Sequence, residues 1–169
     1  MLDMLKRLRR WVAGRVARWR RLPIEYRGVR LTEDERGFLE WFLRDSVWKI
    51  ASRDQQAMIE HLWVADGLCM YAKILLKRAR EEESPCLARS ACESAERATL
   101  VAPDESLYTY RLAGFLDAAG FDNATDYYRK FLERSSRFPG SLAYSPVHKP
   151  EFQEAVEKAT VRLGTAHDS

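Results

Sequence analysis

One stretch of the 169-residue chain, residues 86 to 132, limits the possible folds more than any other. Its pattern predicts three short helices that fold back on one another. The first has small residues at steps of four, three and four positions, namely Ala91, Ala95, Ala98 and Ala102. Such a stripe leaves one helical face smooth enough for another helix to approach closely. Pro103 ends this helix because proline cannot continue it, and Asp104 is a suitable N-cap for the helix that follows.

The second and third helices of this stretch carry larger apolar residues. The second has Tyr108, Leu112, Phe115, Leu116 and Ala119 on one side, and the third has Ala124, Tyr127, Tyr128 and Phe131. Gly120 can take the left-handed conformation that commonly ends a helix. Because only Phe121 to Asn123 separate the two helices, they are expected to lie antiparallel. The sequence therefore predicts an all-α fold.

Seven positions in this stretch resemble the tetratricopeptide repeat, whose 34-residue signature places small, aromatic and proline residues at fixed offsets. They are Ala91, Ala98, Pro103, Leu112, Ala113, Leu116 and Gly120. Beyond Gly120 the register is one residue short, Phe131 stands at a small position, and the terminating proline slips to Pro139. The resemblance covers roughly residues 86 to 139. It implies helical hairpins stacked as a short right-handed solenoid with a concave binding face.

The phase of that repeat implies which residues of the second helix line the concave groove. These are Leu107, Tyr110, Gly114 and Asp117. Family members that grip a C-terminal carboxylate place lysine and asparagine where this chain has Tyr110 and Gly114, so that clamp is not expected. A groove of leucine and tyrosine with one acid suits an apolar helix or extended segment that carries a positive charge. The alternative is that these residues pack on the long helix predicted before the stretch.

The beginning of the chain differs in charge from the remainder. Residues 1 to 30 hold ten Lys or Arg against two acids, a balance of +8, whereas residues 31 to 169 hold eighteen against twenty-three, a balance of −5. Residues 1 to 22 predict a basic amphipathic helix, whose apolar face and cationic flank include Leu5, Leu8, Arg10, Trp11, Val12, Val16, Arg18 and Trp19. Its apolar residues are never consecutive for the ~20 positions that a bilayer crossing requires. It also lacks the uninterrupted apolar region of a secretory signal.

Four interpretations of this helix remain open. It can bind an anionic membrane surface, or its apolar face can dock on a partner or on the body of this protein. A mitochondrial targeting sequence fits the arginines but not the lack of serine. Nucleic acid is disfavoured because the acidic body would oppose binding to phosphates. We expect a cytoplasmic protein, peripheral at the inner face of a membrane, with the mitochondrial matrix as a minor alternative.

The remaining segments predict further helices. Residues 23–31 form a linker, in which a single extended segment has nothing to pair with. A capping box of Thr32 and Glu35 opens a helix over 33–51, crowded with large apolar residues and expected to be buried on two sides. A second helix spans about 54–80, and its seam has a 3.5-residue period: Met58, Leu62, Ala65, Cys69, Ala72, Leu76 and Ala79. Ser84 caps the helix that Pro85 begins.

After the central stretch, a loop is expected to be pinned by Leu142, Tyr144 and Val147. Pro150 opens a last helix that Gly164 stops, with the apolar stripe Phe152, Val156, Ala159 and Leu163. The predicted organisation is thus a basic helix over 1–22, a linker over 23–31, a tetratricopeptide-like domain over 32–164 and a frayed tail over 165–169.

The sequence contains no pattern typical of a catalytic or metal site. Cys69, Cys86 and Cys92 are odd in number and lack a CxxC pair, so we expect reduced, partly buried thiols rather than disulfides or zinc ligands. His61, His148 and His167 are scattered, and no glycine-rich phosphate loop, HExxH or GxSxG motif occurs. We therefore expect no enzyme activity, no metal and no cofactor.

The function that fits these features is a non-enzymatic adaptor or assembly factor. Its body would bind another protein, and its first helix would attach it to a membrane or a larger complex. One alternative is a fixed accessory subunit of a multiprotein assembly. Another is a bacterial secretion chaperone, because residues 148–152, HKPEF, resemble the start of the final helix in those tetratricopeptide proteins. The oligomeric state is left open.

Overall fold

The computed structural model describes residues 22–47 and 53–165, with side chains over 22–43 and 60–164. These residues form six α-helices, one short 3-10 helix and one small hairpin. The elements are β1 (Glu25–Tyr26), β2 (Val29–Arg30), α2 (Glu33–Val47), α3 (Arg53–Glu81), α4 (Pro85–Val101), α5 (Ser106–Ala118), α6 (Ala124–Arg137), η1 (Ser141–Tyr144) and α7 (Lys149–Thr165). The predicted all-α class is confirmed, and so are the three helices predicted between residues 86 and 132.

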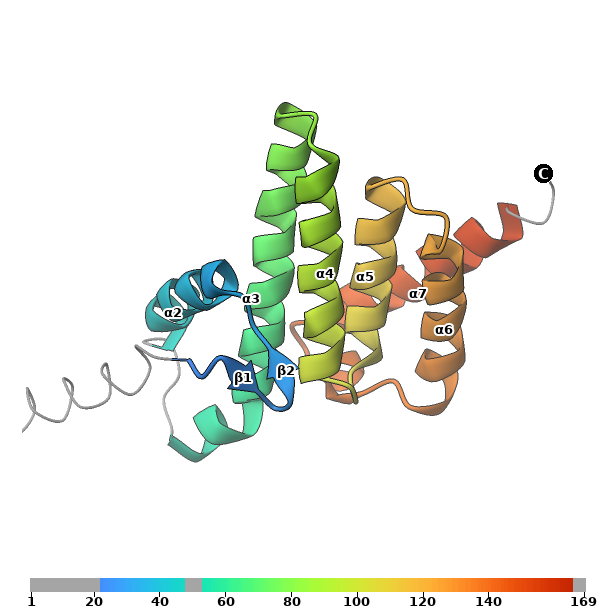
Figure 1. Ribbon diagram of the computed structural model, residues 1–169. Coiled ribbons are helices and arrows are strands. Elements are labelled where there is room, and N and C mark those ends of the chain that lie inside the picture. The colour runs from blue at the N-terminus through green and yellow to red at the C-terminus, as the bar shows by residue number, and fades with distance from the viewer. Residues whose placement is uncertain (1–21, 48–52, 166–169) are drawn as a thin grey trace, which may run out of the picture.

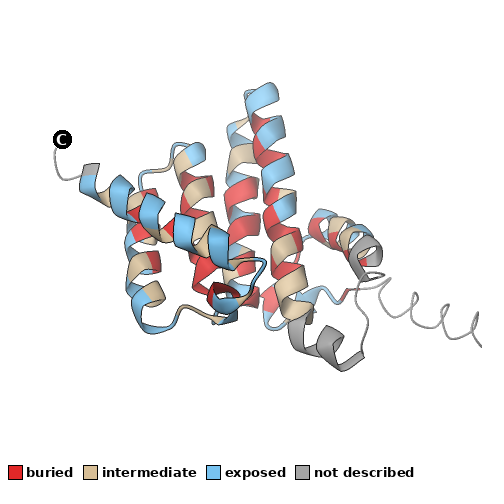
Figure 2. Cartoon of the chain, turned by 180° about the vertical axis from the view of Figure 1, so that it is seen from behind, coloured by how far each residue is buried: buried red, intermediate tan, exposed pale blue. Residues whose placement is uncertain are grey.

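The helices form one layered row. In Figure 1, α3, α4, α5 and α6 lie side by side with successive helices running in opposite directions, and α2 lies on the outer side of α3. Helix α7 crosses the back of α5 and α6, where Figure 2 shows its outer side exposed to solvent. No helix in the described part of the chain combines the length and hydropathy that a bilayer crossing requires.

The tightest packing is between α3 and α4. The predicted stripe of α4 is fully buried at Ala91, Ala95 and Ala98, and small residues of α3, Ala65 and Ala72, are fully buried as well. Small side chains on both helices permit a close approach over a long contact. The hydroxyl of Ser94 donates to the carbonyl of Leu68 across this interface, at 3.3 Å, so the one polar side chain on this face of α4 is satisfied. The predicted seam of α3 is confirmed wherever its side chains are described.

The predicted helix ends are mostly confirmed. Ser84 accepts a hydrogen bond from the Leu87 amide, and Pro85 begins α4. Gly120 has φ +77°, and the amides of Gly120 and Phe121 donate to the carbonyls of Asp117 and Leu116. This pair of bonds is a Schellman motif, which turns the chain from α5 into α6.

The N-cap of α5 differs from the prediction. The cap is Glu105 rather than Asp104, and it makes no side-chain cap hydrogen bond. Its carboxylate accepts bonds from the amides of Ser141 and Leu142, both at 2.9 Å, and from the Ser141 hydroxyl. Glu105 therefore caps η1, which is remote in sequence, and this non-local role could not be read from local spacing.

The expected linker at 23–31 contains a hairpin, so the prediction that its extended segment lacks a partner is wrong. Residues Tyr26 and Val29 pair across an antiparallel register. The turn between them has positive φ at Arg27 (51°) and Gly28 (79°), as a tight type I′ hairpin turn requires. The Arg27 guanidinium donates to the Val101 carbonyl at 3.2 Å, which holds the hairpin against the end of α4. Residues 22 to 31 thus belong to the helical body.

Three further expectations are corrected by the burial of side chains. Helix α2 ends at Val47 and buries Leu39 and Leu43 on one face, while Trp41 is 56% exposed, so it is not buried on two sides over its described part. In the loop after α6, Leu142 is buried but Tyr144 and Val147 are 75% and 80% exposed. Helix α2 packs mainly on α3, so only one of its faces is covered, and of the three loop residues only Leu142 enters the core.

The last helix is also longer than predicted. Helix α7 continues through Gly164 to Thr165, so this glycine does not stop it. Of its predicted stripe, Ala159 is fully buried, whereas Phe152, Val156 and Leu163 are only partly buried against the core. Helix α7 packs across α5 and α6 with one side only, so residues at the border of this contact stay partly exposed.

Candidate functional site

A groove of about 800 Å³ lies between α3, α5 and the start of α7. We call it the α3–α5–α7 groove; it is lined by Phe42, Asp66, Cys69, Met70, Lys73, Leu76, Lys77, Arg80, Arg111, Gly114, Phe115, His148 and Glu151. Its apolar lining comes from α2, α3 and α5, and most of its cations come from α3. Helices α4 and α6 contribute no residue to it. Alternate helices of the row therefore form one hollowed face.

Arg111 holds the floor of the groove together. Its guanidinium donates to both carboxylate oxygens of Glu151, at 2.9 and 2.8 Å, and to Asp66 Oδ1 at 2.6 Å. The Tyr108 hydroxyl lies 3.1 Å from the same Asp66 oxygen and 3.0 Å from the Leu62 carbonyl. One arginine thus joins α3, α5 and α7, and planar two-point pairing of this kind fixes their relative positions.

The ionisable groups of this network are adjusted by burial and by each other. Burial alone would raise the pKa of Glu151, but its hydrogen bonds with Arg111 lower that pKa overall. Burial, and then the nearby Asp66 charge, raise the pKa of Tyr108. Burial raises the pKa of the Cys69 thiol to about 12, so the thiol remains protonated and weakly nucleophilic at neutral pH. These shifts favour a structural network over acid–base or nucleophilic chemistry.

The residues of α5 that were predicted to line the groove lie in different environments. Leu107 is fully buried, so it belongs to the core and cannot face a partner. Tyr110 packs its ring on Tyr128 and Phe131 of α6, at 5.8 and 5.2 Å between centroids. Asp117 accepts a bond from Arg162 of α7 at 2.6 Å.

Of the four predicted residues, only Gly114 lines the α3–α5–α7 groove. The other three point into the helical body or toward helices that follow later in the chain. The phase of α5 alone could not reveal this, because it does not say where α7 crosses.

The charge of the groove also differs from the prediction, in which Asp117 was the one charged residue of the lining. Its lining holds four cations and two acids, and Arg111 binds both acids, Asp66 and Glu151. Lys77 makes only an exposed contact with Glu81, 3.7 Å away. Within the described residues, Lys73 and Arg80 form no ion pair. The groove is therefore cationic, which reverses the sign expected from Asp117.

The sequence does contain a signal for the residues that were missed. Met70, Lys73, Ile74 and Lys77 recur at i, i+3, i+4 and i+7 on a face of α3 that lies beside its buried seam. All four are exposed, including Met70 at 45% and Ile74 at 42%. A mixed apolar and cationic stripe outside the packing seam is a feature that the spacing of residues along one helix can reveal.

An aromatic cluster continues this surface onto α2. The Phe38 ring lies 5.5 Å from Trp41, 6.0 Å from Phe42 and 5.2 Å from Tyr71 of α3. Phe42 also lines the groove. Through Phe38, these ring contacts link Phe42 in the groove lining to the exposed Trp41.

Other candidate chemistry is limited in the residues that are described. No cluster of three or more His, Cys, Asp or Glu there could hold a metal ion. Burial, and then the nearby Arg27 charge, lower the pKa of His61. Cys69 and Cys92 are buried, whereas Cys86 is exposed at the start of α4, contrary to the expectation of partial burial.

The predicted attachment residues, from Leu5 to Trp19, lie outside the described part of the chain. The structure begins at Leu22, which is buried and held on α2. Its amide donates to Glu40 at 3.1 Å, and its carbonyl accepts from Arg36 at 3.0 Å. No family model, curated protein or solved structure matches the chain.

Proposed function

We propose that this protein is a non-enzymatic scaffold of the tetratricopeptide type that binds a segment of another protein in the α3–α5–α7 groove. The observation that carries this proposal is the origin of the groove lining. Most of its residues come from α3, α5 and the start of α7, with Phe42 added from α2, while α4 and α6 stand outside it. Stacked helical hairpins create a binding face in this way, because the first helix of each pair lines the inner side of the curve.

The antiparallel pairs α3 with α4 and α5 with α6 support this proposal. The network around Arg111 supports it as well, because it makes the groove floor rigid. A rigid groove loses little conformational entropy on binding, so more of the contact energy appears as affinity. The apolar lining from Phe42, Met70 and Phe115 is of the kind that anchors a bound segment.

Site-specific photocrosslinking in the cells that make the protein tests this proposal. A photoreactive phenylalanine analogue replaces Met70 in the groove or, as a matched control, Arg129 on the exposed side of α6. We expect a discrete crosslinked protein from position 70 and none from position 129. Crosslinks from position 129 alone would assign the binding face to the other side of the helical row.

The N-terminal segment is proposed to attach this scaffold to a membrane surface or to a larger complex, at the cytoplasmic side. Leu22 fixes the point at which the segment leaves the body, beside Glu40 of α2. Liposome flotation compares the full chain with a variant that begins at Leu22, since a start at Thr32 would delete buried Leu22, Val29 and Leu31. Equal flotation of both proteins on anionic vesicles would remove the membrane from the proposal.

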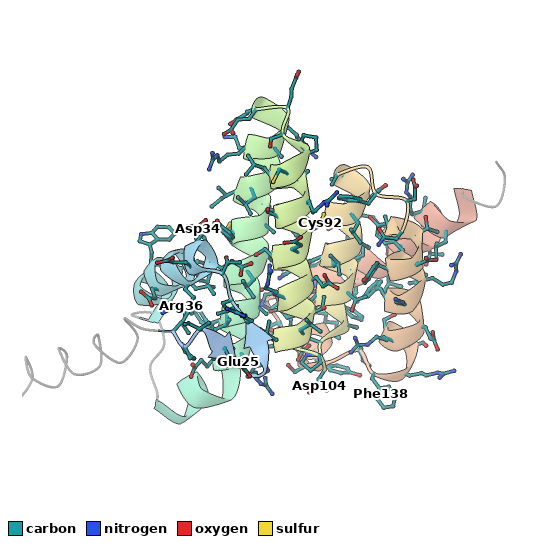
Figure 3. All side chains as sticks on the ribbon, in the orientation of Figure 1. Glu25, Asp34, Arg36, Cys92, Asp104 and Phe138 are labelled. Atoms are coloured by element: carbon teal, nitrogen blue, oxygen red, sulfur yellow. The ribbon has the colours of Figure 1, made fainter. Side chains whose placement is uncertain are left out.

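An accessory subunit of a larger assembly is the second candidate, and exposed apolar residues outside the groove favour it. Trp41 is 56% exposed and Phe138 is 75% exposed. Figure 3 shows the Phe138 ring extending beyond the end of α6, away from the other helices. Size-exclusion chromatography separates the two candidates, because an isolated subunit should self-associate through such surfaces, whereas a free scaffold should elute as a monomer.

A further inference from the structure

The edge of the α3–α5–α7 groove carries a row of three cations, of which only Lys77 has a described carboxylate within ion-pair distance, the exposed Glu81 at 3.7 Å. Lys73, Lys77 and Arg80 are exposed at steps of four and three residues, so they lie along one face of α3 over roughly 10 Å. The two acids of the groove lining, Asp66 and Glu151, are already held by Arg111. The row therefore presents a positive field toward the groove.

The floor beside this row is apolar and adaptable. Met70 is 45% exposed and shares the groove lining with Phe42 and Phe115. A thioether side chain can repack around different shapes, which suits a surface that receives a side chain from outside. The site thus offers an apolar floor along a cationic edge.

From this arrangement we infer that the occupant of the groove is an acidic amphipathic segment of a partner protein. Its apolar side chains at helical spacing contact Met70 and Phe115, and its Asp or Glu residues face Lys73 and Arg80. This inference rests on the proposed function and specifies the chemistry of the partner. Charge complementarity of this kind selects the partner and speeds its encounter with the groove.

Two other occupants fit the groove less well. The N-terminal segment of this chain is cationic, with a balance of +8 over residues 1 to 30, so the row of cations repels it. An anionic lipid surface is planar, whereas the apolar contacts of this site lie inside a hollow between helices. A partner segment satisfies both the charge and the shape.

Selection from a random 16-residue phage-displayed peptide library on the immobilised full-length protein tests the inference. The charge variant K73E/K77E/R80E reverses the row, and the control R89E/R129E/K130E reverses three exposed cations elsewhere and has the same net charge. A third variant, M70S, removes the apolar floor. Circular dichroism verifies that all three variants keep the helical content of the unmodified protein.

We expect the selected peptides to combine Asp or Glu with apolar residues at helical spacing. The charge variant should weaken their affinity at least about tenfold, as expected for charge pairs at an interface, and the control should change it less than about twofold. Affinity should also fall with rising salt.

The opposite outcomes are distinct. In the first, the selected peptides depend on Met70 but contain no acidic residues and bind the charge variant with unchanged affinity. This result would overturn the inference and leave the proposed function standing. Absence of any peptide that depends on Met70 would overturn both. If light scattering finds a dimer that the charge variant dissolves, the occupant is a second copy. If only anionic vesicles or poly-uridine respond to the charge variant, the row binds a polyanion and the inference fails.

Discussion

The Arg111 guanidinium pairs with both carboxylate oxygens of Glu151, forty residues later in the chain, at 2.9 and 2.8 Å. The same guanidinium reaches Asp66 of α3 at 2.6 Å. One planar cation therefore joins α5 to a helix beyond η1, in addition to the Asp117–Arg162 pair between the same two helices. The site and the stability of the fold depend on the same group.

Arg111→Met should destabilise the protein by about 2–3 kcal/mol, because it leaves two carboxylates facing each other without a cation. The estimate lies below that for a fully buried pair because the Glu151 side chain is 41% exposed. Urea unfolding measures the effect. Arg129→Met is the control: its pair with Asp126 is exposed on both sides, so its loss should cost less than about 0.5 kcal/mol. Similar small effects for both variants would contradict the structural role of Arg111.

Stability should depend on the charge of Glu151 at low pH. The pKa of this carboxyl in the folded protein is lowered from its ordinary value of 4.5, because the bonds from Arg111 outweigh the effect of burial. Its contribution is complete above that ordinary value and is lost as the pH falls below it, through the folded pKa. Asp66, His148 and Arg111 surround it. Glu151→Gln should therefore lose less stability than the unmodified protein between about pH 4.5 and pH 3, measured by urea unfolding at each pH. Parallel curves for the two proteins would argue against this linkage.

The capping box of α2 should contribute more to the free energy of unfolding than its two local hydrogen bonds alone would give. Glu35 accepts from the Thr32 amide at 2.8 Å and also from Arg97 of α4 at 3.0 Å, and it is only 2% exposed. Glu35→Ala should cost about 2–4 kcal/mol because it leaves Arg97 without this partner, whereas Thr32→Ala should cost about 1 kcal/mol. Exposed Glu33 provides a control, for which thermal unfolding should detect little change. Equal losses for Glu35→Ala and Thr32→Ala would show that the bond to Arg97 contributes nothing.

Two glycines with positive φ should respond differently to alanine. Gly120 has open space around it, so Gly120→Ala should cost about 1 kcal/mol of backbone strain. At Gly140 a Cβ would lie 2.3 Å from Glu105 Oε2 and 2.8 Å from the Asp104 carbonyl. Gly140→Ala should therefore cost more than Gly120→Ala, because it also displaces the carboxylate that caps η1. Denaturant unfolding of both variants ranks them, and the reverse order would contradict the packing at η1.

Thiol labelling should distinguish the three cysteines. Cys86 is exposed, while Cys69 and Cys92 are buried, and burial raises their pKa values to about 12 and about 11. A thiol-specific chromophore should label Cys86 rapidly in the folded protein and the other two only after unfolding. Cys86→Ser should abolish the rapid phase. Rapid labelling that persists in this variant would mean that a second thiol is accessible.

Much of the local structure follows from the sequence because short-range rules govern it. The Ala91 to Ala102 stripe, the Thr32 capping box, and the turn at Gly120 depend on residues within a few positions of one another. The hairpin at residues 25 to 30 is not predicted from the sequence, because its turn residues, Arg27 and Gly28, are not one of the pairs that typically mark a type I′ turn. The predicted seam of α3 is confirmed where its side chains are described, because a 3.5-residue period can be read from the sequence of one helix.

The binding site depended on contacts that no local pattern contains. The repeat phase named Leu107, Tyr110 and Asp117, but in the fold Leu107 enters the core, Tyr110 packs on α6 and Asp117 pairs with Arg162 of α7. The position of α7 depends on long-range contacts, among them the Arg111–Glu151 pair with α5 and the packing of Phe152 on Phe131 of α6. The spacing of these residues in the chain carries no geometric information. That crossing leaves Lys73 and Arg80 unopposed and makes the groove cationic.

The sequence alone thus determined the helices, their ends and most of their buried faces, since propensity, capping and hydrophobic period act over a few residues. The tertiary structure alone decided which exposed faces border a common hollow and which charges there are neutralised. The physical reason is that both depend on which helices meet in space, and the energy of that meeting is distributed over residues distant in the chain.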